Sequence, residues 1–373
     1  RKDMETGFIG INSFNSRTYS DSLARSSIGF NVHTFEVDQK VEGFRLEAEI
    51  GAGRYYAPGY KSEWGEAINV KLSGTKERTG IPLELHYYRI SPQVINNNAI
   101  FWNTSIVEVS NNELPAGVAG SNSALIPFAS SVVPIGLMTN NRTGLNINGE
   151  IDLGDLNVNF GYGVASEIEP ISNQITYSHP VNQLTRSRFW RFNFPAGVGP
   201  YDRYSVVFRD AFETVNLTDD RFGEVVNRKH FTNAEIQAKY NTFILNKAFY
   251  AFLLGRYNTV QPEFKVILPL NEDAYMRMYS TELETYWRLS KGVVWANYFG
   301  YERNIGNYDT DIDTGSRKPR NQVGTGFGSG LDLNIGKNAL FTFRHRFFYF
   351  KDKSFANDRF RGQETMLEIK VFF

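Results

Sequence analysis

Five histidines are the side chains of this sequence best suited to acid–base or nucleophilic catalysis: His33, His86, His179, His230 and His345. A histidine base needs a nucleophile such as serine and an orienting carboxylate within reach. No motif of that kind surrounds any of the five, and the sequence has no cysteine to act as a thiol nucleophile or thiolate ligand. We therefore predict that the protein is not an enzyme.

Two further patterns resemble ligand sites without completing one. Asp309, Asp311 and Asp313 alternate as in a calcium-binding loop, but the central glycine and the downstream glutamate are missing. The glycines at 324, 326, 328 and 330 imitate a phosphate-binding loop, yet they occupy every second position of a predicted strand and no helix follows. We predict no metal site and no cofactor.

The remaining polar residues that could do chemistry alternate with apolar ones. In residues 43–53, Phe44, Leu46 and Ile50 alternate with Arg45 and Glu47, which places charges on one face of an extended strand. The same period places six more polar residues on one face of later strands, namely Asn69, Lys71, Asn146, Asn148, Glu235 and Lys239. Such a strand presents one face to water and the other to an apolar medium.

Composition agrees with a protein built from many strands. The chain has 373 residues, of which 15% are aromatic, and its 32 glycines are spread along the whole length. The formal net charge is zero, which argues against nucleic-acid binding. No apolar run approaches the 18 or so residues of a membrane-spanning helix, whereas a membrane strand needs only alternate apolar residues.

The connections between the predicted strands alternate between short and long. Short turns are expected near 38–42, 75–80, 154–155, 246–247, 290–292 and 336–338, and long loops at 54–64, 91–143, 304–321 and 351–361. This alternation is typical of an all-β, transmembrane, antiparallel up-and-down β-barrel, here a single domain over 1–373. We expect about 16 strands, or alternatively 14, with both termini in the periplasm. A soluble β-sandwich or lipocalin-like barrel is the alternative, but charges and amides on one face of strand after strand speak against it.

The last segment carries a recognisable pattern. Leu367, Ile369, Val371 and Phe373 share one face of an alternating strand. This resembles the C-terminal assembly signal of Gram-negative outer-membrane proteins, which implies recognition by the barrel assembly machinery, an integral place in the outer membrane and contact with its lipids. The rich use of Asn, Tyr and Phe is similar to that of Bacteroidota outer-membrane proteins. No specific family is matched.

The loop predicted at 91–143 is too apolar to lie free in water. It contains Phe128, Val132, Val133 and Ile135, so we expect it to fold into the lumen as a constriction, to cover the extracellular mouth, or to dock on another protein. Residues 178–202 could form a second such element.

Two functions follow from these alternatives. The first is a porin-like channel for passive diffusion of small hydrophilic solutes, with Arg45, Glu47, Asn69, Lys71, Asn146, Asn148, Glu235 and Lys239 lining the lumen. The second is a non-transporting barrel that anchors or scaffolds a multi-protein outer-membrane or secretion complex. An envelope protein partner or a homo-oligomer is expected as a possible assembly. A barrel enzyme acting on lipid through His345 is a distant third.

Overall fold

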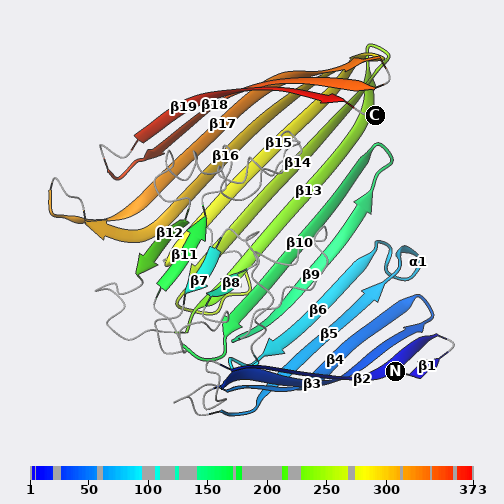
Figure 1. Ribbon diagram of the computed structural model, residues 1–373, viewed down its shortest axis with the longest axis vertical. Helices are drawn as coiled ribbons and strands as arrows, with labels where there is room; N and C mark the ends of the chain where they lie inside the picture. The colour runs from blue at the N-terminus through cyan, green and yellow to red at the C-terminus, as the bar shows by residue number, and fades with distance from the viewer. Residues whose placement is uncertain are drawn as a thin grey trace.

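One long antiparallel sheet dominates the computed structural model (Figure 1). The structure describes residues 2–4, 6–19, 27–56, 62–94, 106–109, 122–125, 141–170, 174–178, 212–216, 228–267, 274–310, 314–336, 338–355 and 359–371. Within these, the large sheet has 15 strands in the order β1-β2-β3-β4-β5-β6-β9-β10-β13-β14-β15-β16-β17-β18-β19. Apart from the strands of a second sheet, every strand therefore pairs with its predecessor in the chain, as an up-and-down architecture requires.

The longest strands of the large sheet are β16 with 18 residues and β17 with 19. The bounds of all its strands are β1 Lys2–Met4, β2 Gly7–Tyr19, β3 Ser27–Val41, β4 Phe44–Tyr56, β5 Gly65–Gly74, β6 Leu83–Ile90, β9 Arg142–Asp152, β10 Leu156–Glu167, β13 His230–Ile244, β14 Lys247–Gln261, β15 Met276–Ser290, β16 Val293–Thr310, β17 Arg317–Ile335, β18 Ala339–Asp352 and β19 Arg359–Val371. Fourteen of the 15 have eight or more residues, and β1 has three. This tally lies between the two predicted strand numbers.

Short turns gather at one end of the sheet and long connections at the other, as the alternation predicts. The turn between β3 and β4 consists of Glu42 and Gly43, and the turn between β13 and β14 of Leu245 and Asn246, all four with positive φ. Such turns match the right-handed twist of the paired strands. Figure 1 shows the N- and C-termini at the same end as these turns. We call this the turn end and the opposite one the loop end.

One predicted long loop is wrong. The chain from 304 to 321 was expected to be irregular, but β16 continues to Thr310 and β17 begins at Arg317, with the pairs Ile305↔Asn321 and Asp309↔Lys318. A register shift near Gly306 lets the hairpin continue past that point. The described part of the chain holds a single helix, the four-residue α1 (Lys76–Thr79) in the turn between β5 and β6, and none long enough to cross a membrane.

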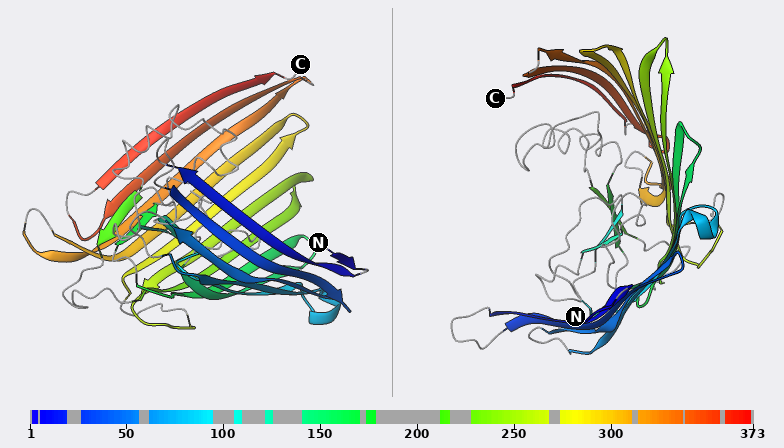
Figure 2. Two further views of the ribbon diagram at one scale, coloured as in Figure 1. Left: turned by 60° about the horizontal axis from the view of Figure 1, so that its bottom comes forward. Right: turned by 90° about the vertical axis from the view of Figure 1, so that its right-hand side faces the viewer.

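Strands from the two long connections pair with one another. β7 (Ile106–Val109) and β8 (Asn122–Leu125) come from the connection after β6, while β11 (Gln174–Ser178) and β12 (Phe212–Asn216) come from the one after β10. They form a second sheet in the order β12-β11-β7-β8. The right-hand view of Figure 2 shows this small sheet on the concave side of the large one. The segments 91–143 and 178–202 were predicted as separate irregular loops. The two connections that contain them both contribute strands to one inner sheet.

The two faces of the large sheet differ in chemistry. Its convex face exposes large apolar side chains along the full strand order, among them Phe35, Ile50, Leu85, Leu145, Ile236, Leu253, Leu283, Phe299, Phe327, Phe347 and Leu367. The buried residues of the opposite face include many polar and charged side chains. A soluble protein would bury the first set and expose the second. The sheet is therefore built for an apolar surrounding outside and a polar interior.

Candidate functional site

The concave face of the N-terminal strands carries a connected set of charges. Arg45 on β4 contacts the carboxylates of Asp38 at 2.6 Å and Glu47 at 2.9 Å. Lys71 on β5 then lies 3.2 Å from Glu47 and 3.5 Å from Glu84 on β6. The register makes this possible, because Glu47 pairs directly with Lys71. These side chains are partly exposed, so each pair contributes little to stability, and their main effect is to place fixed charges along the inner wall.

Amides continue this row across the next strands. Asn148 on β9 donates to Glu84 at 3.3 Å, and the Nε2 of His86 lies 2.6 Å from the Oδ1 of Asn69. Asn146 and Asn148 are both almost completely buried on this face. Six of the eight residues predicted to line a lumen, Arg45, Glu47, Asn69, Lys71, Asn146 and Asn148, therefore lie together on one continuous stretch of the concave wall.

The other two predicted lining residues lie on β13, apart from this stretch. Glu235 is buried and accepts a hydrogen bond from Arg256 of β14 at 3.1 Å. Lys239 has the same strand parity but is exposed toward the turn end. Their assignment as lining residues stays a prediction.

An acidic group on β15 and β16 extends the wall beside Glu235. Glu282, Glu284 and Glu302 share the inward parity of their strands. Ser280 pairs with Arg256 on one side and with Glu302 on the other, so Glu302 lies in the same cross-strand row as Arg256. Glu284 also accepts a hydrogen bond from the hydroxyl of Tyr286 at 2.9 Å. The sequence prediction missed these glutamates, although their alternation with Thr281, Leu283 and Tyr301 carries the same period-2 signal.

On the concave face of β17 and β18, Arg344 packs against the sheet. The guanidinium of Arg344 lies 2.6 Å from Asp332, which also accepts a hydrogen bond from Thr342 at 3.1 Å, and Arg344 is fully buried. Gly330 pairs with Arg344, and a Cβ added at Gly330 would lie 2.6 Å from the Cδ of that side chain. Gly330 therefore leaves room for the side chain of Arg344.

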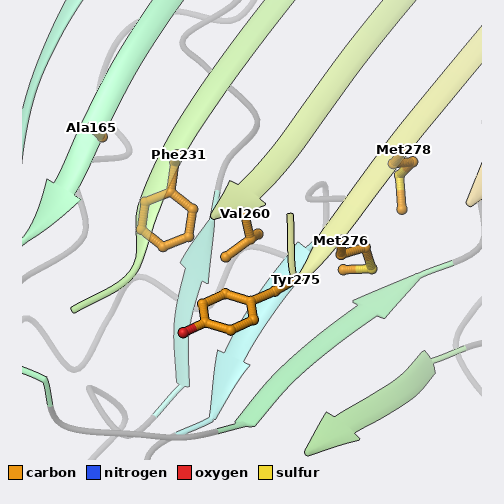
Figure 3. Close-up of a cluster of buried hydrophobic side chains, with 6 residues drawn as sticks. All are labelled: Ala165, Phe231, Val260, Tyr275, Met276 and Met278. Carbon is orange, nitrogen blue, oxygen red and sulfur yellow. The ribbon is translucent and has the colours of Figure 1, made fainter. Parts of the chain in front are cut away.

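The loop end of the concave wall is apolar and tightly packed. Figure 3 shows Ala165, Phe231, Val260, Tyr275, Met276 and Met278 as one buried cluster. The guanidinium of Arg142 lies 4.1 Å from the centre of the Phe231 ring, a cation–π contact. Next to it, the fully buried Lys229 lies 2.8 Å from Glu167. The concave face is therefore polar along most of its length and carries a buried apolar cluster near the loop end.

The other predicted site residues divide into two groups. Leu367, Ile369 and Val371 of β19 all expose more than half of their surface on the convex face, in line with the predicted strand pattern. Phe128, Val132, Val133, Ile135 and Phe373 lie outside the described residues. His345 is on the convex face, where its Nδ1 lies 2.7 Å from the Oγ1 of Thr365 and its ring meets the edge of Phe347.

An antiparallel up-and-down sheet with an apolar outer face and a polar inner face is the architecture of integral outer-membrane β-barrel proteins. The predicted all-β, antiparallel up-and-down architecture and the location in an outer membrane are therefore confirmed, while closure of the barrel and the periplasmic termini stay predictions. The described residues record no pairing between β1 or β2 at one edge of the sheet and β19 at the other.

Comparison with solved structures finds bacterial outer-membrane proteins at low similarity. OmpT of Vibrio cholerae is 8% identical over 100% of this chain and 99% of its own, with a TM-score of 0.29. OprD of Pseudomonas aeruginosa is 9% identical over 98% of this chain and 92% of its own, with a TM-score of 0.28. The ferric-catecholate import receptor Fiu of E. coli is 8% identical over 99% of this chain and 63% of its own, with a TM-score of 0.38.

No family model and no curated protein matches the sequence. The fold class accordingly rests on the strand pairing and on the two faces of the sheet, and the resemblance to Bacteroidota proteins stays a prediction.

Proposed function

We propose that the protein is a porin-like channel for passive diffusion of small hydrophilic solutes. The observation that carries this proposal is the row of charges and amides on the concave wall from Asp38 to Asn148, opposite an apolar convex face. Fixed charges and amides replace part of the hydration shell of a passing solute, which an apolar wall could not do. Because both signs of charge alternate along the row, we expect weak ion selectivity.

The channel requires a closed barrel. A free strand edge in the hydrocarbon region would leave backbone groups without hydrogen-bond partners, at several kcal/mol each. We therefore propose that β19 pairs with β2 in the membrane. The short turns and both termini then face the periplasm, and the long connections face outward from the cell.

Single-channel conductance in a planar bilayer tests the channel. The intact protein and a variant lacking residues 111–140 are each reconstituted in neutral lipid. Discrete current steps in the intact protein, larger after the deletion, are the expected result, since the inner sheet comes from the same connection. Silence in both proteins, with the fold verified by circular dichroism, would overturn the proposal.

The second candidate is a non-transporting barrel that anchors or scaffolds an envelope complex. The feature that favours it is the buried apolar cluster at the loop end of the concave wall, together with the inner sheet β12-β11-β7-β8. A lumen filled at that level would block diffusion. Current steps that appear only after the deletion would support this plugged barrel.

A further inference from the structure

Five cations stand on the convex face at the loop end of β15 to β19. Arg277, Arg303, Lys351, Arg359 and Arg361 all have the odd parity of the exposed apolar residues Leu283, Phe299, Phe347 and Leu367 on the same strands. They therefore point away from the channel wall that the proposed function uses. No sequence motif singled them out.

Their height along the strands matches a membrane boundary. Arg303 lies ten residues from Val293, where β16 begins, and Arg361 lies ten residues from Val371, where β19 ends. Transmembrane strands take about 9–11 residues to cross the hydrocarbon. The outward residues between these limits on β16, such as Trp295, Phe299 and Tyr301, are mostly aromatic. The cations consequently lie where hydrocarbon gives way to headgroups.

Three of them form one row across neighbouring strands. Arg303 pairs with Val323, Val323 pairs with Lys351, and Lys351 pairs directly with Arg359. Arg361 lies beside the row, opposite Tyr349. The Nε of Arg303 donates to Asn321 at 3.1 Å, which fixes the direction of its guanidinium.

The described carboxylates of β15 to β19 occupy the face opposite to this row. Like charges directly opposite each other in a sheet are destabilising. Among the described residues of β15 to β19, the positions of outward parity include no aspartate or glutamate, because Glu282, Glu302, Asp332 and Asp352 all have inward parity. A bound anion would relieve the repulsion between Lys351 and Arg359.

We propose that Arg303, Lys351 and Arg359, with Arg361 beside them, bind the phosphate groups of a lipid headgroup in the leaflet at the loop end. Guanidinium groups form paired, charge-assisted hydrogen bonds with phosphate, and lysine adds a point charge. The source of the phosphate is a lipid, because the row continues directly into the apolar band of Phe347 and Tyr349 that acyl chains contact. A phosphorylated lipid thus satisfies both the charges and the adjoining apolar surface.

The inference rests on the membrane span that the proposed function requires. It does not depend on channel activity, because conductance is measured in neutral lipid and therefore without the lipid that the site binds. The test uses the full chain in detergent and measures binding of lipid A, a doubly phosphorylated lipid, by native mass spectrometry. The variant R303Q/K351Q/R359Q is compared with K76Q/K247Q/K291Q, which removes three exposed cations at the turn end. A dephosphorylated lipid A and inorganic phosphate as a competitor separate the contribution of the phosphate from that of the chains.

We expect the row variant to lose at least about tenfold of its affinity for lipid A, while the turn-end variant keeps its affinity. The row variant loses three charge-assisted bonds, and each partly exposed bond contributes up to roughly a tenfold factor. Equal binding by all three proteins, an equal loss in both variants, or equal binding of the dephosphorylated lipid would each overturn the proposal. If millimolar inorganic phosphate displaced lipid A, the site would recognise phosphate alone, and the proposal that its ligand is a lipid would be overturned.

Should the triple variant fail to fold, the conservative exchange K351R/R359K and the single R359Q test the same site. The first should retain binding, because it keeps both charges, and the second should weaken it. Binding unaffected by R359Q and abolished by K351R/R359K would contradict a phosphate site.

Discussion

At the scale of single residues, Lys71 holds the inner charge row together. Its ammonium group lies within 3.5 Å of both Glu47 and Glu84, so it bridges two carboxylates on the strands that flank β5. Its removal would leave those carboxylates facing any solute that follows the wall. The ion preference of the proposed channel should therefore depend on this one side chain.

We predict that Lys71→Glu makes the channel prefer cations. A unit charge 4 Å away in water is worth about 1 kcal/mol, so the ratio of cation to anion permeability should rise several-fold. Reversal potentials across a potassium chloride gradient measure this ratio. Lys247→Glu, on β14 but with outward parity, is the control, and an equal change in both variants would show that the inner row does not face the permeating ions.

Lys229 and Glu167 form an almost completely buried ion pair, with side-chain exposures of 0% and 1%. Glu167 also accepts a hydrogen bond from the backbone N–H of Lys229 at 2.8 Å. Loss of Lys229 removes a cation 2.8 Å from this buried carboxylate, and breaking a buried ion pair costs far more than the pair itself contributes.

We therefore predict that Lys229→Met lowers the free energy of unfolding by about 3–5 kcal/mol. Urea titration of the protein folded into vesicles, followed by tryptophan fluorescence, measures the change. Arg78→Met, which breaks the exposed pair between Arg78 and Glu42 at 3.5 Å, should have little effect. Similar stabilities of the two variants would contradict a special role for the buried pair.

At the scale of elements, β17 is shaped to accept β18. Gly330 allows the stem of Arg344 to lie against the strand, and Arg344 in turn reaches Asp332. A Cβ at Gly330 would lie 2.1 Å from the carbonyl oxygen of Phe343 and would push the two strands apart. The glycine is thus required by a close approach and not by its backbone angles.

We predict that Gly330→Leu destabilises the protein by about 2 kcal/mol or more, since overpacking forces both Arg344 and the backbone to shift. The same urea titration detects this loss. Gly154→Leu is not a suitable control because of its positive φ, so Gly292→Leu, whose added Cβ has its nearest atom at 3.4 Å, provides the comparison. If the two leucine variants were equally stable, the packing of Arg344 would not be the reason for Gly330.

At the scale of the whole molecule, closure of the sheet decides whether a channel exists. The described pairing runs continuously from β1 to β19, and Figure 2 shows the sheet curved around its concave side. β2 and β19 have 13 residues each, enough to span the hydrocarbon. Because the chain contains no cysteine, cysteines introduced into β2 and β19 test the pairing of these strands without interference from native thiols.

We predict that a cysteine at Ser13 of β2 forms an intramolecular disulfide with a cysteine at one of Gln363, Thr365 or Leu367 of β19. The positions share outward parity and lie near mid-strand, and a disulfide needs Cα atoms within about 7 Å. Mobility on a non-reducing gel detects the cross-link. A cysteine at Ile147 of the distant β9 in place of the β19 cysteine should give none, and failure at all three β19 positions would contradict closure through β2.

The sequence by itself determined the strands and their two faces. Alternation in Phe44–Ile50 and Leu367–Val371 predicts extended structure whatever the partners, because side chains of a strand point to opposite faces at each step. For the same reason six of the eight expected lining residues, from Arg45 to Asn148, lie together on one wall. The short turn at Gly154 could also be located, since its positive φ favours glycine.

Only the tertiary structure decided which strands meet. The pairing of β7 with β11 joins connections that are far apart in the sequence, and no local pattern encodes such a partner. The continuation of β16 and β17 beyond 304, the row Arg303–Val323–Lys351–Arg359 and the packing of Arg344 on Gly330 all depend on the register between strands. Register is set by the sum of many cross-strand contacts, so it becomes visible only when the strands are placed side by side.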